Sequence, residues 1–327
     1  TWSHNGNYDT QYRYDSNGNL LNLQRRGPLS TQWMDDLSYT YGANTGGPNR
    51  LSHVNENSSI AWSTYDNDVE NQGADNYGYD EIGNLIRDNS EQISQINWTP
   101  EGKVSQVKFN ALGHAAGKKN IEYRYDAQGN RLKKSLIEVT YIGGGGITTE
   151  TVEEQFYSRG PDGTLLALYT YREQDETLRQ EEVPFYGSKR LGLQRFTDRI
   201  MNVDGGSPAL LEQRRGDKVF ELNNHLGNTL ATVSDQKHGV DVGPAGDADW
   251  HLATPQSGSD YYPVGLAMAG RQASADDYRY GFNGKENDRD WGTKWIQDYG
   301  FRLYNPSIAK CLSVDPLTAE YPWYTPY

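Results

Sequence analysis

Three segments of the chain alternate aromatic and polar residues and then run into a short polar stretch. They are Tyr12–Leu20, Tyr77–Leu85 and Tyr123–Leu132, which read YRYDSNGNL, YGYDEIGNL and YRYDAQGNRL. Because strand side chains alternate between two faces, Tyr-x-Tyr places both rings on one face. Asp-x-x-Gly-Asn is typical of a turn, since Asp accepts backbone N–H groups and Gly supplies a positive φ. Each segment therefore predicts a strand, a tight hairpin turn and a second strand.

Further copies of this pattern lie between and after the three segments. Residues 98–104 have Trp98 in place of the second Tyr and Gly102 at the turn, and residues 161–165 and 223–230 carry looser versions. The clear copies are spaced close to multiples of about 22 residues, a period expected of repeat proteins. Hairpins of this size cannot bury a core alone and must pair side by side. We therefore predict an all-β fold of repeated antiparallel β-hairpins that form a long curled sheet.

Composition narrows the class of protein. The 327 residues include only 35% hydrophobic residues but 24 Tyr and 8 Trp, a content that disordered chains lack. The net charge of −13 argues against nucleic-acid binding and is typical of a soluble surface, which could also attract a basic guest. The single cysteine, Cys311, excludes an internal disulfide and a zinc–cysteine site. No apolar run reaches the roughly 18 residues of a membrane span, so none is predicted.

Gly and Pro residues mark the expected interruptions of the sheet. Gly143–Gly146 lies between two strand-like segments and predicts a hairpin tip, whereas the polar, Gly- and Pro-rich stretch at 235–258 predicts a long loop. Strands are expected near 165–171 and 219–222. The chain begins at Thr1 without Met, and we expect it to be a fragment of a longer protein.

The last 50 residues have a different texture and carry a resemblance. Residues 280–286 (YGFNGKE), 299–306 (YGFRLYNP) and 312–317 (LSVDPL) closely resemble the RHS-repeat-associated core domain. The upstream Tyr-Asp units resemble the YD repeats of the same family, and the ending 321–327 (YPWYTPY) resembles its Bacteroidetes branch. The resemblance is strong at 8–135 and 278–327 and looser between. It divides the chain into a repeat sheet at 1–277 and a core segment at 278–327.

This resemblance implies the shell of a secreted bacterial polymorphic toxin. Members of the family wind a β-sheet ribbon into a hollow cocoon that encapsulates a variable C-terminal effector, often a toxin. The implied partners are that effector and secretion machinery or cell-surface components, and the implied location is secreted or at the cell surface. A cell-surface adhesin or a carbohydrate-binding repeat protein is the alternative. The effector, secretion route and target cell are not specified by the sequence.

The resemblance also implies candidate catalytic residues for an aspartyl self-cleavage. Asp315 matches the Asp before Pro in the terminal signature, Asp290 (or Asp288) follows the Gly-Lys-Glu motif, and Arg279 is the matching Arg. Two close carboxylates share a proton, so one can serve as acid and the other as base. Asp315 is equally suited to form a turn ahead of Pro316, and Asp290 to be a surface charge. The expected cut lies beyond Tyr327, and no activity on other substrates is predicted.

Other candidate chemistry is weaker. Family members often have Asp and Gly where this chain has Asn305 and Ala309. The six histidines show no metal-ligand spacing, and no cofactor or metal site is predicted. Cys311 has no His nearby in sequence, so a packed residue is favoured over a nucleophile.

Overall fold

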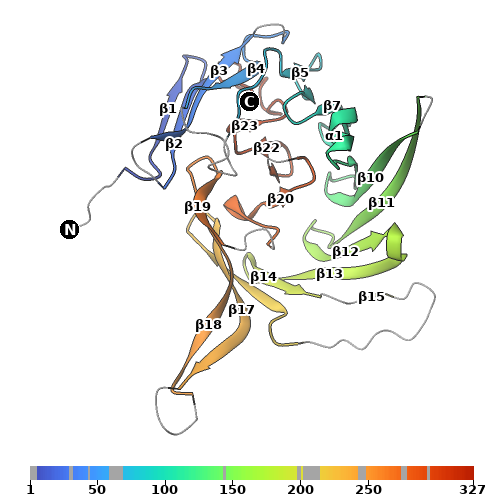
Figure 1. The fold of residues 1–327 in the computed structure, drawn as a ribbon, viewed down its shortest axis with the longest axis vertical. Helices are drawn as coiled ribbons and strands as arrows, with labels where there is room; N and C mark the ends of the chain where they lie inside the picture. The colour runs from blue at the N-terminus through green and yellow to red at the C-terminus, as the bar shows by residue number, and fades with distance from the viewer. Residues whose placement is uncertain are drawn as a thin grey trace. The chain divides into compact units, whose positions relative to one another are not determined.

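The computed structural model describes residues 6–28, 32–42, 45–58, 69–142, 145–196, 200–201, 214–241, 248–273, 278–292 and 295–327. The chain forms two compact units. Unit 1 comprises Thr1–Asn120, Asp260–Gln272 and Lys285–Tyr327, and unit 2 comprises Ile121–Ser259 and Ala273–Gly284. Strands make up most of both units (Figure 1).

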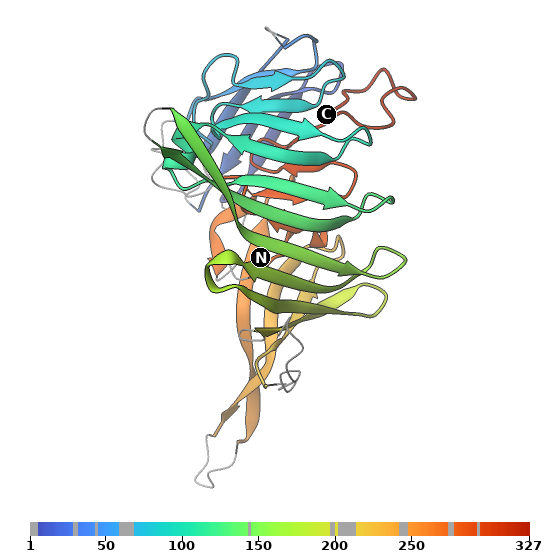
Figure 2. The ribbon, with the colours of Figure 1, turned by 90° about the vertical axis from the view of Figure 1, so that its right-hand side faces the viewer.

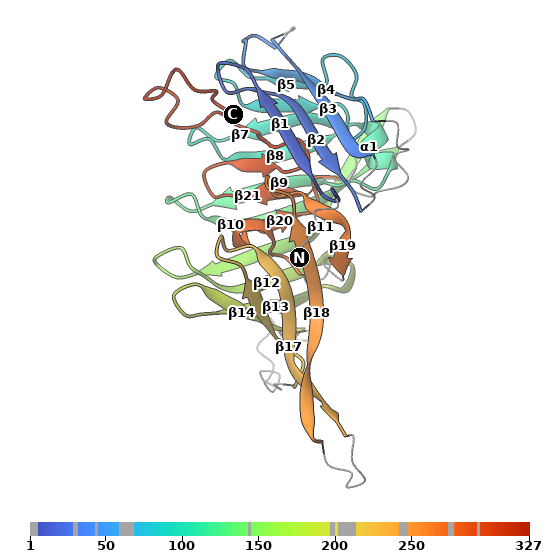
Figure 3. The same ribbon diagram turned by 90° about the vertical axis from the view of Figure 1, so that its left-hand side faces the viewer.

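Unit 1 begins with a four-stranded antiparallel sheet in the order β1-β2-β3-β4, whose strands lie side by side in Figure 3. The strands are β1 (Thr10–Tyr14), β2 (Leu20–Arg26), β3 (Trp33–Tyr41) and β4 (Leu51–Glu56). Leu23, Leu37 and Val54 are fully buried and alternate with more exposed neighbours along their strands. Period-2 patterning of this kind is what one buried face of a sheet requires.

The same unit continues with a second run of antiparallel strands in chain order. They are β5 (Tyr77–Tyr79), β6 (Leu85–Asp88), β7 (Ile93–Trp98) and β8 (Val104–Phe109), followed by the short helix α1 (Ala111–Ala115). Asn110 caps this helix, because its side chain accepts a hydrogen bond from the Gly113 amide. Ile96, Val104 and Val107 are the most deeply buried side chains of this run.

The rest of unit 1 comes from the C-terminal third of the chain. Strand β19 (Ala267–Ala273) begins in this unit, and four short strands then pair in the order β20-β21-β22-β23. These are β20 (Glu286–Asp288), β21 (Ile296–Asp298), β22 (Leu303–Asn305) and β23 (Lys310–Cys311). Met34 of β3 packs in one buried cluster with Tyr262, Leu266 and Ala269, so distant parts of the sequence share this core.

Unit 2 is a run of longer hairpins, which lie side by side in Figure 2. Its strands pair in the order β9-β10-β11-β12-β13-β14-β16-β17-β18, and β15 also pairs with β13. The bounds are β9 (Asn120–Tyr125), β10 (Arg131–Ile142), β11 (Gly146–Arg159), β12 (Leu165–Arg172), β13 (Thr177–Tyr186), β14 (Arg190–Arg195), β15 (Ile200–Met201), β16 (Lys218–Asn223), β17 (Thr229–Val240) and β18 (Trp250–Tyr261). The 3-10 helices η2 (Glu173–Asp175) and η4 (Phe282–Gly284) complete it.

The repeated turn has the predicted conformation. Gly18, Gly83, Gly102 and Gly129 all lie between paired strands with φ between 76° and 103°. At the first turn Asp15 Oδ1 accepts the amides of Asn17 and Asn19 at 2.9 and 2.8 Å, and its Oδ2 accepts the Asn19 side chain at 2.8 Å. The turn at Asp126 repeats this pattern, and the turn at Asp80 differs only in that the Gly83 amide is the first donor.

The looser copies close in the same way. The Thr99 amide donates to the Lys103 carbonyl at 2.7 Å, and the Asn224 amide donates to the Asn228 carbonyl at 3.0 Å. In the hairpins that turn at Gly18, Gly83, Gly102 and Gly227, the register of strand pairing shifts just before the turn. This shift produces a β-bulge at the second aromatic position of the motif or its equivalent. The all-β class of repeated antiparallel hairpins is therefore confirmed.

The predicted long loop at 235–258 is wrong. Strand β17 runs on to Val240 and β18 begins at Trp250, so most of this stretch is an antiparallel ribbon. Its single Pro in a strand, Pro255, lies where the register shifts between Val233 and Lys237, a bulge position at which Pro is tolerated. The content of Gly and Pro did not predict these strands. Pairing across a long ribbon satisfies the backbone N–H and C=O groups even where the strands have no apolar face.

The predicted hairpin tip at Gly143–Gly146 is consistent with the pairing of Ile142 with Gly146 across β10 and β11, although residues 143 and 144 lie outside the described part. The strands expected near 165–171 and 219–222 are β12 and β16. The expected boundary at 277/278 was drawn from a change in sequence composition, and it stays a prediction. The two compact units are each built from separate stretches of the chain and do not divide there.

Candidate functional site

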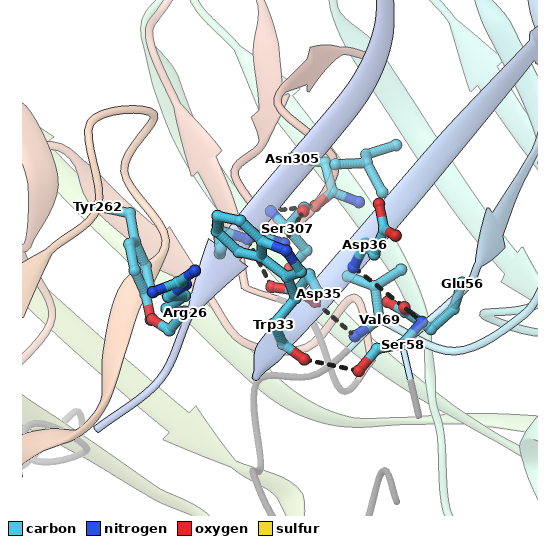
Figure 4. A network of polar contacts seen from close by, with 12 residues as sticks. Arg26, Trp33, Asp35, Asp36, Glu56, Ser58, Val69, Tyr262, Asn305 and Ser307 are labelled. Atoms are coloured by element: carbon cyan, nitrogen blue, oxygen red, sulfur yellow. Dashed lines mark hydrogen bonds and ion pairs between the residues drawn. The ribbon is translucent and has the colours of Figure 1, made fainter. Parts of the chain in front are cut away.

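The C-terminal segment of unit 1 is held on the first sheet by a buried ion pair. Arg25 and Asp35 lie directly opposite each other on β2 and β3, and Arg25 Nε is 2.6 Å from Asp35 Oδ2 with both side chains fully buried. Arg25 Nη2 also donates to the Ser307 carbonyl at 2.7 Å, in the turn between β22 and β23. The Val69 amide donates to Asp35 Oδ1 at 3.3 Å (Figure 4). The pair thus joins three segments that are far apart in sequence.

Tyrosines of β3 hold the same turn. Tyr39 donates its hydroxyl to the Ile308 carbonyl at 3.0 Å, and the Lys310 ammonium lies 4.9 Å from the ring centre of Tyr41. Burial lowers the pKa of Lys310 to about 8, although the nearby Cys311 and Asp15 oppose this shift. These contacts place the two departures from the family pattern, Asn305 and Ala309, inside a packed turn.

Of the two departures, Asn305 has a structural explanation and Ala309 does not. Asn305 is buried, and its Oδ1 accepts the Ser307 amide at 3.0 Å, a turn contact that Asn and Asp make equally well. Ala309 has a φ of 53°, the left-handed region that favours Gly. Asn305 therefore keeps the turn without burying a charge. Ala309 carries backbone strain that a Gly at this position would avoid.

Asp315 combines two roles. Its Oδ2 lies 2.9 Å from Arg302 Nη2, and its Oδ1 accepts the Leu317 amide at 2.9 Å, as a turn-forming Asp ahead of Pro316 does. Its own amide donates to the Pro326 carbonyl at 2.9 Å. The carboxylate is about one third exposed, so it remains accessible to water and to a further group. Asp315 is therefore both a turn former and a charged site beside an Arg.

The other predicted aspartates lie in and just after β20, the first strand of the β20–β23 sheet. Asp288 ends β20, pairs with Ile296 of β21 and is buried. The Asp290 amide lies 3.4 Å from Asp288 Oδ1, and Asp290 is half-buried. The structure places both aspartates and Asp315 in unit 1. Their shared role in cleavage stays a prediction.

Arg279 lies in unit 2. Its Nε donates to Glu182 Oε2 at 3.2 Å. The neighbouring Tyr278 and Tyr280 belong to a buried cluster with Leu193 and Val219, so this part of the predicted core segment packs on β14 and β16. The role of Arg279 in cleavage stays a prediction.

The last residues of the chain dock on turns of the repeats. Tyr327 donates its hydroxyl to the Gly83 carbonyl at 2.8 Å, and its ring meets that of Tyr79 edge-on at 5.9 Å. The Leu85 amide donates to the Leu312 carbonyl at 2.8 Å. A small pocket here is lined by Tyr79, Lys310 and Tyr327 among others. The turn at Asp80 therefore does more than close its hairpin, because it also binds the C-terminal segment.

Cys311 lines the same pocket. Burial raises the pKa of its thiol; Arg302 and Lys310 act against this rise, and Asp315 adds to it. A raised pKa disfavours the thiolate that a cysteine nucleophile needs. Its environment therefore agrees with a packed residue.

Two carboxyl groups of unit 1, the buried Asp88 and the half-buried Glu56, predict a pH dependence. Burial, with the charge of Glu91, raises the pKa of Asp88 to about 6, and burial raises that of Glu56 to about 7. The folded state then holds protons that the unfolded chain releases above pH ~4, so stability should fall as pH rises from ~4 to ~7. We expect Asp88→Asn to gain about 3 kcal/mol over wild type at pH ~7.5 and nothing at pH ~4. The Asn side chain can still accept hydrogen bonds from Asn76 and Ser90 through its Oδ1.

Urea unfolding at several pH values would measure this, with Asp126→Asn as the opposite control. Hydrogen bonds from Asn130 lower the pKa of Asp126, so its substitution should cost stability at neutral pH. Equal shifts for Asp88→Asn at both ends of the range would contradict the prediction.

Sequence reasoning missed several of these residues. Arg302 lies within the motif at 299–306, yet only the fold brings it to Asp315. Arg25 and Asp35 did carry a signal, since each is two residues from a buried Leu on the same strand face, Leu23 and Leu37. The docking of Tyr327 on Gly83 had no signal, because 244 positions separate the two.

Within the described ranges, no group of three or more His, Cys, Asp or Glu side chains could hold a metal ion. The helices that the structure describes are all too short or too polar to cross a membrane.

No family model matches the chain. A curated protein, "Toxin subunit YenC1" of Yersinia entomophaga, is 24% identical to it over 350 residues, which cover 94% of this chain and 34% of that protein. The chain therefore spans about a third of the length of this relative.

Solved structures of TcdB2-TccC3 are also similar. The TcdB2-TccC3-TEV structure has a TM-score of 0.43 and 17% identity over 94% of this chain and 14% of its own. The TcdB2-TccC3 structure has a TM-score of 0.41 and 17% identity over 94% of this chain and 17% of its own.

Proposed function

We propose that this chain is part of the shell of a secreted bacterial toxin of the RHS type, which encapsulates and delivers a C-terminal effector. The observation that carries the proposal is the similarity to a toxin subunit over 94% of the chain. The residues at 280–286, 299–306 and 312–317 that resemble the RHS-associated core support it. The effector of the same polypeptide would be the main partner, and secretion machinery or cell-surface components would be further ones.

The local structure supports a shell rather than a single-pocket protein. Each Asp-x-x-Gly-Asn turn satisfies its own backbone groups, as at Asp15 and Asp126, so a hairpin can be added without a new core around its turn. In unit 2 the longer strands β10 to β13 also pair as successive antiparallel hairpins. Such units build a large surface from repeated parts, which is what enclosing another domain requires.

We further propose that the core segment cleaves the polypeptide beyond Tyr327. Asp315 would act with Asp290 or Asp288, one carboxylate taking a proton from water and the other giving a proton to the leaving amine. Arg302, whose Nη2 lies 2.9 Å from Asp315 Oδ2, would hold that carboxylate in place, and Arg279 is the Arg that the family resemblance assigns. The hydrogen bond from the Asp315 amide to the Pro326 carbonyl supports this, because it holds the last residues next to Asp315.

A surface adhesin or carbohydrate-binding protein is the alternative. Tyr321, Trp323 and Tyr324 are exposed near the end of the chain and contact one another edge-on or tilted. Exposed aromatic rings of this kind can stack on sugars.

Protease protection of the full-length protein tests encapsulation. We expect the region after residue 327 to resist a protease that readily digests the same region expressed alone, because a shell excludes the protease. The control is the same comparison after the shell has been unfolded in urea, when protection should disappear. Equal digestion of the folded full-length protein and the isolated region would contradict encapsulation and favour the adhesin.

A further inference from the structure

We propose that the turn at Gly83 is a docking site for the Tyr327 phenol, and that this contact sets the register in which the chain beyond residue 327 meets Asp315. The second half of this proposal rests on the cleavage proposed above. Tyr327 and Arg50 would then be positioning residues.

The phenol is held on more than one side. Its oxygen donates to the Gly83 carbonyl at 2.8 Å, and the Tyr79 ring lies at 61° to its ring with centres 5.9 Å apart. Burial raises the pKa of Tyr327, and the charge and hydrogen bond of Arg50 partly offset this. Arg50 is itself fixed, because Nη2 donates to the Glu81 carbonyl at 2.8 Å and Nη1 to the Thr45 carbonyl at 3.1 Å.

The missing side chain at Gly83 makes room for this contact. A Cβ there would lie 2.6 Å from Tyr327 Oη and 2.7 Å from a methyl carbon of Val314. Gly102 occupies the equivalent turn position with φ of 76°, and a Cβ there would meet nothing within 4 Å. The positive φ favours Gly at both turns. Of these two turns, only the one at Gly83 also needs the absence of a Cβ to make room for Tyr327.

A second contact lies one residue earlier. The Asp315 amide binds the Pro326 carbonyl at 2.9 Å, so residues 326 and 327 are held at two points by different partners. A slip of one residue would move the following peptide bonds by about 3.5 Å. That exceeds the tolerance of proton transfer, which needs heavy atoms within about 3 Å. The two contacts together therefore select which bond Asp315 can reach.

The test uses the full-length protein with Tyr327→Phe and Gly83→Ala, and with Gly102→Ala as the matched control for backbone strain. Mass spectrometry of the fragments gives the cut position, and a time course gives the rate. Hydrogen exchange of the residue 315 amide, measured in uncleavable Asp315→Asn protein, reports docking independently of cleavage. We expect protection of this amide to fall about five-fold in Tyr327→Phe. It should fall further in Gly83→Ala and change little in Gly102→Ala.

In the cleaving protein, Gly83→Ala should cut at several bonds or about ten-fold more slowly, while Gly102→Ala should cut as wild type does. Unchanged exchange of the residue 315 amide in both Tyr327→Phe and Gly83→Ala would overturn the docking site. Changed exchange with one unchanged cut position and rate would overturn the register role. A wild-type protein that is not cut at all would overturn the cleavage, and the register role with it, while the exchange data would still decide the docking.

Discussion

Full-length protein that carries Asp315→Asn is expected to run as one band on a denaturing gel, where the wild type gives two. Asn keeps the turn contacts, since its Oδ1 can still accept the Leu317 amide, but it cannot exchange a proton. Loss of an essential acid or base should slow cleavage by at least 10²-fold. Asp290→Asn and Asp288→Asn test which second carboxylate takes part.

Asp298→Asn is the matched control, because Asp298 Oδ1 accepts the Gly300 amide at 2.7 Å in a similar turn contact. It should cleave as wild type does. Replacing Arg302 or Arg279 by Lys shows which Arg matters. If wild type also remains whole, the core segment only fills a structural role, and Asn305 and Ala309 are the first departures from the family pattern to revert.

Arg25→Met is expected to destabilise unit 1 by about 3–5 kcal/mol. Met is of similar length, so the loss comes mainly from leaving the Asp35 carboxylate buried without its cation. The Ser307 carbonyl loses its donor as well, which should loosen the turn between β22 and β23. The midpoint of urea unfolding, followed by tryptophan fluorescence, measures the effect.

Two comparisons isolate the charge. Arg25→Met combined with Asp35→Leu removes both charges and should recover much of the lost stability. Arg271→Ala breaks the exposed pair of Arg271 with Asp260 and should cost less than about 1 kcal/mol. A cost for Arg25→Met as small as that for Arg271→Ala would show that the buried pair does not hold the segment.

The repeated turns could be predicted because their chemistry is local. Asp80, Gly83 and Asn84 lie within five residues, so the hydrogen bonds that fix the turn are present in the sequence itself. The same reasoning predicted the left-handed glycines and the all-β class. It failed at 235–258, where pairing between β17 and β18 decides the structure and Gly and Pro content does not.

The sequence alone thus determined the repeat, the hairpins and the positions of the candidate aspartates. Tertiary structure decided the partners of those side chains: Arg302 for Asp315, Ser307 for the Arg25–Asp35 pair, and Gly83 for Tyr327. The reason is physical. Turn geometry depends on neighbours a few bonds away, whereas these contacts join residues 13 to 282 positions apart, which only chain folding and burial bring together.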